Sequence, residues 1–356
     1  MMIKLPQAPE FWWHRHSIVG VALSPVGALY GQIAGRRMAR PGVSASVPVI
    51  CVGNLVAGGA GKTPTALEVA SVCRKLRLNP GFLTRGYRGR EAGPLVVSLA
   101  VHSPHDVGDE ALLLAQYAPT VVAADRPSGA KLLASLGADV VVMDDGFQNP
   151  SLNKDLALIV VDAARGIGNG FTLPAGPLRA PLAYQIRSAD GLIVLGEGSG
   201  GTAVRAAARA GLPILRARTE AARRRGLRRH AYLAFAGIGD PAKFYETLAA
   251  CGAVVGHTMS FPDHHVFTHD DCETILAEAK KRSLVPITTE KDRVRLNRGG
   301  DAAERLAAAA ETFPIHVRFD EPRRLVVLIE DAVAAHASAY RRSRPVISRG
   351  EEIAPA

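Results

Sequence analysis

The chain of 356 residues is poor in cysteine and in acidic side chains. Its four cysteines are scattered and form no Cys-x-x-Cys pair, which argues against a zinc site and against a disulfide scaffold. We therefore expect a reducing, cytoplasmic environment. Lys and Arg outnumber Asp and Glu by 43 to 33, and the net charge of +10 predicts an anionic partner. Charge alone does not choose among nucleic acid, lipid headgroups and a phosphorylated substrate.

We also expect no cleavable signal peptide, because aromatic and basic residues precede the first apolar stretch and no small-residue cleavage site follows it. That stretch, from Ser17 to Ala34, is uncharged but short of the ~20 strongly apolar residues that span a bilayer. Trp12 and Trp13 precede it and arginines follow it, which is typical of a bilayer–water boundary. We expect a helix lying in one leaflet. A transmembrane span and a helix docked on the protein's own core are the alternatives.

Short β-branched runs alternate with helical patterns, which predicts an α/β fold with a mostly parallel sheet flanked by helices. The arginine-rich stretch 223–229 interrupts this alternation, so we expect a second, smaller α/β domain after it. Its last expected elements are a strand at 315–319 and a helix at 325–337. The predicted division is an N-terminal membrane-associated helix (1–40), a first domain (41–222), a smaller domain (223–344) and a flexible tail (345–356).

The strongest motif is a glycine-rich run that directly follows a predicted strand and precedes a predicted helix. In a phosphate-binding loop (P-loop), glycines let backbone N–H groups converge on a β-phosphate, a lysine reaches the β- and γ-phosphates, and a hydroxyl binds Mg²⁺. The usual Gly-x-x-x-x-Gly-Lys-Ser/Thr pattern has glycine where this chain has Val56, and Gly58 and Gly59 supply the flexibility instead. A glycine-rich turn without a ligand is the alternative. The expected nucleotide-binding residues are Val56, Ala57, Gly58, Gly59, Ala60, Gly61, Lys62 and Thr63.

Two acidic residues, Asp144 and Asp145, end a later strand. A nucleotide-bound Mg²⁺ needs a carboxylate ligand at the strand ends beside a P-loop, so we expect the metal here. Solvated loop aspartates are the alternative.

Two further groups of residues suit proton transfer. Asp109 and Glu110 begin a predicted helix, whose dipole keeps carboxylates ionised, and simple helix capping explains them equally well. His264 and His265 lie in a polar loop, where adjacent histidines are more often surface residues than catalytic ones.

Taken in order, these motifs resemble the tetraacyldisaccharide 4'-kinases, the lipid A 4'-kinase family, from about Trp12 to Leu296. Each motif is weak alone, but the ordered set is specific. The motifs are Val52-Gly-Asn54, Gly58-Gly-Ala-Gly-Lys-Thr-Pro64, Thr84-Arg-Gly-Tyr-Arg-Gly89, Gly108-Asp-Glu110, Asp144-Asp-Gly-Phe-Gln148, Leu173-Pro-Ala-Gly-Pro-Leu-Arg179, Phe235-Ala-Gly-Ile-Gly239, Phe261-Pro-Asp-His-His265 and Thr288-Thr-Glu-Lys-Asp292.

The resemblance implies transfer of the γ-phosphoryl group from ATP, with Mg²⁺, to the 4'-hydroxyl of a tetraacylated glucosamine disaccharide 1-phosphate. It implies a P-loop NTPase-like domain joined to a smaller α/β domain, with the N-terminal helix on the cytoplasmic face of the bacterial inner membrane. The expected partners are the lipid substrate and the membrane surface. We expect a monomer that binds no nucleic acid.

The resemblance also implies roles for single residues. Lys62 and Thr63 match the phosphate-loop lysine and the Mg²⁺-binding hydroxyl, and Asp144 and Asp145 match the acidic pair near the metal. The chain departs from the family at Asn149, where histidine is common, and at Ala180, where glutamate is common. The missing glutamate removes one carboxylate from the metal side, and Glu110 is the candidate replacement.

On the acceptor side, Asp109 matches the aspartate proposed to accept the proton of the sugar hydroxyl. His264 matches the histidine that partners it from the second domain, and His265 remains an alternative. A base split between two domains assembles only on closure, which limits wasteful ATP hydrolysis. The expected substrate-side residues are Arg179, Gln148 and Tyr87.

Three other functions account for part of the sequence. The deviant P-loop ATPases have a lysine at the position of Ala57, which argues against that class. A membrane-associated nucleotide-binding adaptor needs neither Asp109 nor His264. A nucleic-acid-binding protein explains the charge, but the sequence has no helix-turn-helix and no RNA-binding aromatic signature. The lipid kinase explains all of these features together.

Overall fold

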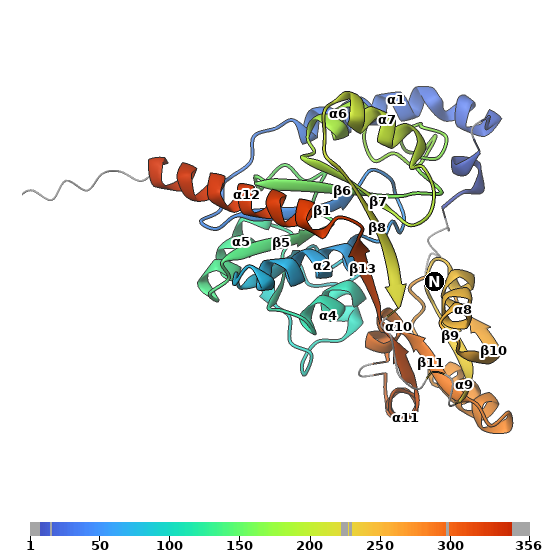
Figure 1. Cartoon of the computed structure of the whole chain (residues 1–356). Helices are drawn as coiled ribbons and strands as arrows, with labels where there is room; N and C mark the ends of the chain where they lie inside the picture. The colour runs from blue at the N-terminus through green and yellow to red at the C-terminus, as the bar shows by residue number, and fades with distance from the viewer. Residues whose placement is uncertain (1–7, 15, 222–226, 228–229, 297–298, 344–356) are drawn as a thin grey trace, which may run out of the picture.

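The computed structural model describes residues 8–14, 16–221, 227, 230–296 and 299–343. Within these residues the strands form two sheets, a large one of nine strands and a small one of four (Figure 1). The large sheet contains, in spatial order, β13 (Ile315–Phe319), β8 (Ile214–Ala221), β7 (Gly191–Leu195), β6 (Leu156–Asp162), β1 (Val49–Asn54), β5 (Val140–Asp144), β2 (Pro80–Thr84), β4 (Thr120–Val122) and β3 (Leu95–Val96). The small sheet contains β10 (Val254–Ser260), β9 (Ala231–Ala236), β11 (Val285–Thr289) and β12 (Glu311–Phe313).

The strands of the large sheet run parallel except at its two edges, where β3 and β13 are antiparallel to their neighbours. The described helices are η1 (Glu10–Trp13), α1 (Ile18–Met38), α2 (Lys62–Lys75), α3 (Pro104–Val107), α4 (Asp109–Ala115), α5 (Arg126–Ser135), α6 (Leu182–Arg187), α7 (Gly201–Arg209), α8 (Pro241–Ala250), α9 (His269–Lys281), α10 (Glu290–Arg295), α11 (Asp301–Ala309) and α12 (Pro322–Ser343). The predicted α/β fold with a mostly parallel sheet is therefore confirmed.

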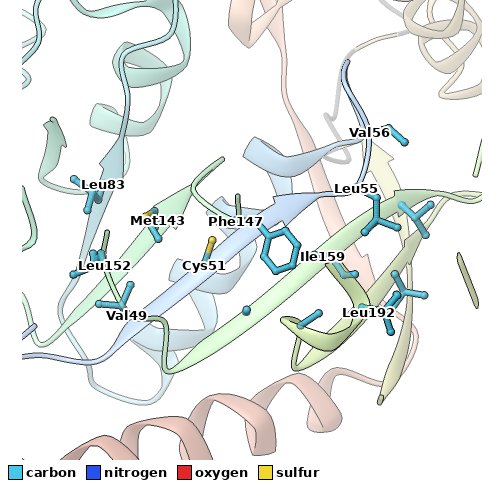
Figure 2. Close-up of a cluster of buried hydrophobic side chains, with 14 of the residues drawn as sticks. Val49, Cys51, Leu55, Val56, Leu83, Met143, Phe147, Leu152, Ile159 and Leu192 are labelled. Carbon is cyan, nitrogen blue, oxygen red and sulfur yellow. The ribbon is translucent and has the colours of Figure 1, made fainter. Parts of the chain in front are cut away.

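Helices cover both faces of the large sheet because its central strands are apolar on both sides. Successive residues of β1 alternate between two cores: Val49 and Cys51 lie in one, and Ile50 and Val52 lie in the other. Helices α5, α6 and α7 cover the first core, in which Phe147 packs beside β1 (Figure 2). Helices α2, α4 and α12 cover the second.

Strand β13 and helix α12 were expected in the smaller domain. In the structure β13 pairs within the large sheet, and α12 packs on that sheet. Val317 and Phe319 of β13 are buried while His316 and Arg318 are exposed, so one apolar face of the strand joins the core under α2. Strand β13 pairs with β8, and only Pro314 separates it from β12 of the small sheet. The small sheet is thus an insertion between two neighbouring strands of the large one.

The predicted boundary and the predicted tail fall on residues that the structure does not describe. Apart from Leu227, the stretch 223–229 lies outside the described residues, and so does the tail 345–356. The division of the chain at these positions stays a prediction.

Helix α1 presents its glycines to the protein and its large apolar side chains to the outside. Gly27, Gly31 and Gly35 are buried, and a Cβ at any of them would press against Thr172 or Tyr184. Figure 1 shows α1 beside α6, which contains Tyr184. The exposed side chains include Ile18, Val21, Val26, Leu29 and Ile33. Of the helices that the structure describes, α1 alone is long and apolar enough to cross a membrane.

Candidate active site

The glycine-rich loop connects β1 to α2, at the carboxyl edge of the large sheet. Gly58 and Gly61 have φ angles of +109° and +80°, which side chains of L-residues rarely adopt. A Cβ at Gly61 would lie 2.2 Å from the Leu195 side chain, so glycine is required there for two reasons. Backbone N–H groups at the start of α2 have no partner within the helix, which makes this turn suited to phosphate.

One network of polar side chains contacts this loop and contains Lys62, Asp145, Arg179 and Gln148. Lys62 Nζ lies 3.7 Å from Asp145 Oδ2, and the Arg179 guanidinium donates to both Asp145 oxygens, at 2.5 and 3.1 Å. Arg179 also donates to the Val56 carbonyl at 3.1 Å and to Gln148 Oε1 at 3.3 Å. Burial acts to raise the pKa of Asp145, but Lys62 and Arg179 outweigh it and hold that pKa low. Arg179 and Gln148 therefore support the loop, and their contact with a substrate stays a prediction.

Thr63 and Asp144 are placed to hold a metal ion. Thr63 Oγ1 donates to Asp144 Oδ2 at 2.9 Å, whereas Asp144 Oδ1 is buried with no hydrogen-bond partner among the described residues. Burial, with nearby Glu110, raises the pKa of Asp144 to about 7. In the described part of the chain, no group of three or more His, Cys, Asp or Glu side chains is arranged to hold a metal ion. Mg²⁺ at nucleotide sites needs only one or two carboxylates besides phosphates and water, so Thr63 and Asp144 fit it.

Asp109 and His264 meet across the two sheets. Asp109 begins α4 beside the large sheet, and His264 lies in the loop after β10 of the small sheet. His264 Nδ1 is 2.9 Å from Asp109 Oδ2, and Glu110 N donates to Asp109 Oδ1 at 2.9 Å. Burial acts to raise the pKa of Asp109, but the hydrogen bond with His264 and the charge of Arg295 hold it well below its ordinary value. The carboxyl group is therefore ionised at neutral pH.

His265 does not share this geometry. Its Nε2 lies 2.9 Å from Asp271 Oδ2 at the start of α9, and its ring stacks on Phe261 at a centroid distance of 4.9 Å. Of the two adjacent histidines, only His264 contacts Asp109. Tyr87, at 53% exposure, lies edge-on to the His264 ring, with centroids 5.9 Å apart.

Two basic residues of α10 complete the site. Lys291 lies in one of the motifs of the family resemblance but was given no role, and Arg295 was not predicted. Arg295 donates to Asp109 Oδ2 from Nε at 2.8 Å, and Lys291 Nζ is 2.9 Å from Glu110 Oε1. Glu110 thus pairs with a lysine in this structure, and its predicted role as a metal ligand stays untested. The signal that could have found these residues is their spacing, because Lys291 and Arg295 share one helix face four residues apart. That spacing predicts neither the partners of Lys291 and Arg295 nor the distance between the two sheets.

Comparison with known proteins places the chain in a family. The family model described as tetraacyldisaccharide-1-P 4'-kinase matches residues 19–334. Curated proteins named tetraacyldisaccharide 4'-kinase include one from Methylobacterium sp. (strain 4-46), 54% identical over 82% of this chain and 89% of that protein. The protein of that name from Methylobacterium nodulans is 48% identical over 95% of this chain and 99% of its own length.

The solved structures include a similar one. A crystal structure of LpxK from Aquifex aeolicus in complex with ATP aligns with a TM-score of 0.68 and 26% identity, covering 89% of this chain and all of that one. The fold, the family model and the curated relatives agree. The chain belongs to the tetraacyldisaccharide 4'-kinase family and is an enzyme of the transferase class.

Proposed function

We propose that this chain transfers the γ-phosphoryl group of ATP to the 4'-hydroxyl of a tetraacylated glucosamine disaccharide 1-phosphate. The observation that carries the proposal is the 2.9 Å contact between Asp109 and His264. A simple ATPase or a nucleotide-binding adaptor does not require a buried carboxylate–imidazole pair. In a kinase such a pair can accept the proton of the substrate hydroxyl. The names of the curated relatives support the acceptor.

The nucleotide side binds and aligns the phosphates. Backbone N–H groups of residues 58–63 and the Lys62 ammonium surround the β- and γ-phosphates. Thr63 and Asp144 would hold Mg²⁺, which when bound neutralises charge that develops on the phosphate oxygens. Asp145 and Arg179 fix the position of Lys62 and of the loop carbonyl at Val56.

The acceptor side removes the proton through His264. The family resemblance gives Asp109 the role of proton acceptor. We assign that role to the imidazole instead, because His264 and Arg295 hold the pKa of Asp109 well below its ordinary value. Asp109 accepts the Nδ1 proton of the imidazole, which leaves the lone pair on Nε2 free for the sugar hydroxyl. A loose phosphoryl transition state needs only modest help with proton removal. The role of Asp109 is therefore to orient the imidazole of His264.

Helix α1 supports a place at the membrane surface, where the lipid substrate resides. Its exposed face is apolar, and Arg36 and Arg37 lie in its last turn, where they suit anionic headgroups. We place this face in the cytoplasmic leaflet of the bacterial inner membrane. The cytoplasmic side supplies the ATP.

Phosphate transfer from γ-labelled ATP to the tetraacyl-disaccharide 1-phosphate in detergent micelles tests the proposal. Wild type should form labelled bisphosphorylated lipid, and Asp109→Ala should form it orders of magnitude more slowly with ATP affinity retained. The matched control is Arg282→Met, because the Arg282 guanidinium pairs with Glu278 on the exposed side of α9. If wild type binds ATP but labels no lipid, the proposed acceptor is wrong.

A further inference from the structure

Arg295 is one of the few charged side chains that the structure buries, with 7% of its surface exposed. All three guanidinium nitrogens have partners. Nε and Nη2 donate to Asp109 Oδ2 at 2.8 and 2.5 Å, and Nη1 donates to the Gly237 carbonyl at 2.5 Å and to Asp292 Oδ1 at 2.7 Å. This planar fork therefore connects α4, the end of β9 and α10 at one point.

The partners of Arg295 are also the groups that hold His264. Asp109 Oδ2 contacts the imidazole ring, and the Gly237 carbonyl accepts the backbone N–H of His264 at 3.0 Å. His264 has a φ angle of +58°, which few residues other than glycine adopt. Its ring direction therefore depends on neighbours that hold the backbone in place.

Asp292 fixes the other end of the arrangement. It accepts hydrogen bonds from Gly237 N at 3.1 Å and from Thr289 Oγ1 at 2.7 Å, besides the one from Arg295. The Gly237 peptide is thus held from both sides, through its N–H by Asp292 and through its carbonyl by Arg295. A change at Arg295 removes one support from the Asp109 carboxylate and one from this peptide.

Lys291 offers an instructive contrast on the same helix. Its ammonium pairs with Glu110, and within the described residues no hydrogen bond joins Glu110 to the His264 ring or to the His264 backbone. Both pairs join α10 to α4, so both contribute to holding the two sheets together. Only Arg295 shares its partners, the Asp109 carboxylate and the Gly237 carbonyl, with His264.

We propose that Arg295 is a positioning residue for phosphoryl transfer, which fixes the Asp109 carboxylate and the Gly237 carbonyl so that together they aim His264 at the acceptor hydroxyl. The proposal rests on the proposed function, because it assigns Arg295 a part in that reaction. A purely structural role would predict lost stability with turnover per folded molecule unchanged. A positioning role predicts lost turnover in molecules that remain folded.

The test compares Arg295→Met and Arg295→Lys with wild type at saturating ATP and lipid. Misplacement of a catalytic group by about 1 Å costs about 10²-fold, so kcat of Arg295→Met should fall by about that factor while both KM values change little. Arg295→Lys should recover part of the loss, since it restores the charge but not the fork. The control is again Arg282→Met, with kcat expected at the wild-type value.

A double-mutant cycle shows whether Arg295 acts through the Asp109–His264 pair. In an Asp109→Asn background, either Arg295 substitution should lower kcat by less than about threefold, because groups that act as a unit are not additive. Equal losses in both backgrounds would overturn the proposal. So would a kcat of Arg295→Met within about threefold of wild type. If Arg295→Met does not fold, the same cycle with Arg295→Lys decides.

The experiments distinguish an error in the role of Arg295 from an error in the proposed function. If wild type labels no lipid, the acceptor assignment falls, and the role of Arg295 in it falls as well. If wild type labels the lipid and the Arg295 variants match it, the role of Arg295 alone is wrong.

Discussion

The nucleotide side and the acceptor side of this site are built in different ways. The nucleotide side is local, because one strand, one loop and one helix supply the P-loop, Lys62 and Thr63 without interruption. The acceptor side joins distant parts of the chain: His264 is 155 residues from Asp109, and Arg295 is 186 residues from it. A local site survives small movements of the fold, whereas the acceptor side exists only while the two sheets keep their relative position.

The largest effect is expected on the nucleotide side, from Lys62→Ala. Lys62 is the one P-loop cation in the described structure and is held by Asp145, so its loss leaves developing phosphate charge unopposed. The kcat should fall by about 10³-fold, measured as lipid labelling at saturating ATP. Lys75→Ala is the matched control on the same helix, because Lys75 is exposed and pairs only with Glu68 in the described contacts. Near-normal turnover of Lys62→Ala would show that the loop takes no part in phosphoryl transfer.

The next effect separates the two histidines on the acceptor side. His264→Ala should lower kcat by about 10²-fold with ATP affinity retained, because general base catalysis is lost while the P-loop is untouched. His265→Ala should keep most of the activity, since His265 pairs with Asp271 away from Asp109. ATP affinity by calorimetry and kcat by labelling check both variants. If His265→Ala lost more activity than His264→Ala, the assignment of the proton acceptor to His264 would be wrong.

A smaller effect tests how strictly the loop depends on its glycines. Gly61→Ala forces a left-handed residue to carry a Cβ against Leu195, at a cost of about 1–2 kcal/mol before any clash. ATP affinity should fall by about tenfold, which calorimetry measures directly. Gly59→Ala is the comparison, because no atom lies within 4 Å of its added Cβ and its φ is not left-handed. An equal loss at both positions would contradict the geometric explanation.

The smallest effect is a difference in pH dependence between the two sides. On the acceptor side the pKa of Glu110 is lowered by Lys291, and that of Asp109 is lowered as well. Stability from a lowered pKa is complete above the unfolded-state value of about 4 and is lost as pH falls through the folded value. On the nucleotide side burial raises the pKa of Asp144 to about 7, so stability is lost as pH rises from about 4 to 7.

The melting temperature of the metal-free protein should therefore fall on both sides of a maximum in mildly acidic solution. Asp144→Asn should remove the decline toward neutral pH, and Lys291→Met should weaken the decline in acid, each by a few degrees. Thermal scans between pH 3 and pH 8 measure both. A wild-type melting temperature that rises steadily to pH 8 would show that Asp144 is ionised in the metal-free protein.

The sequence predicts those features whose residues are contiguous. The P-loop, the α/β fold and the strand ends at Asp144 follow from local pattern, and the structure bears out the fold. The pairing of Asp109 with His264 came from family resemblance, since no spacing along the chain encodes a contact over 155 residues. The contact between Arg295 and Asp109, over 186 residues, is not encoded by spacing for the same physical reason.

Two other features show the limit of local pattern. The alternation at 315–319 identifies a strand but not its sheet, because its apolar face can join the core of either sheet and the alternation does not say which. The glycines of α1 dilute an apolar stretch when counted along the sequence. In the helix they gather on the docked face, and the outer face remains apolar.

The insertion of the small sheet between β8 and β13 bears on how His264 is held. A single residue, Pro314, joins β12 to β13, and its ring restricts the backbone at that point. So short a connection keeps β12 close to β13, and with it the sheet whose strand β10 precedes His264. Much of the entropic cost of bringing the imidazole to Asp109 is therefore met when the chain folds, before any substrate binds.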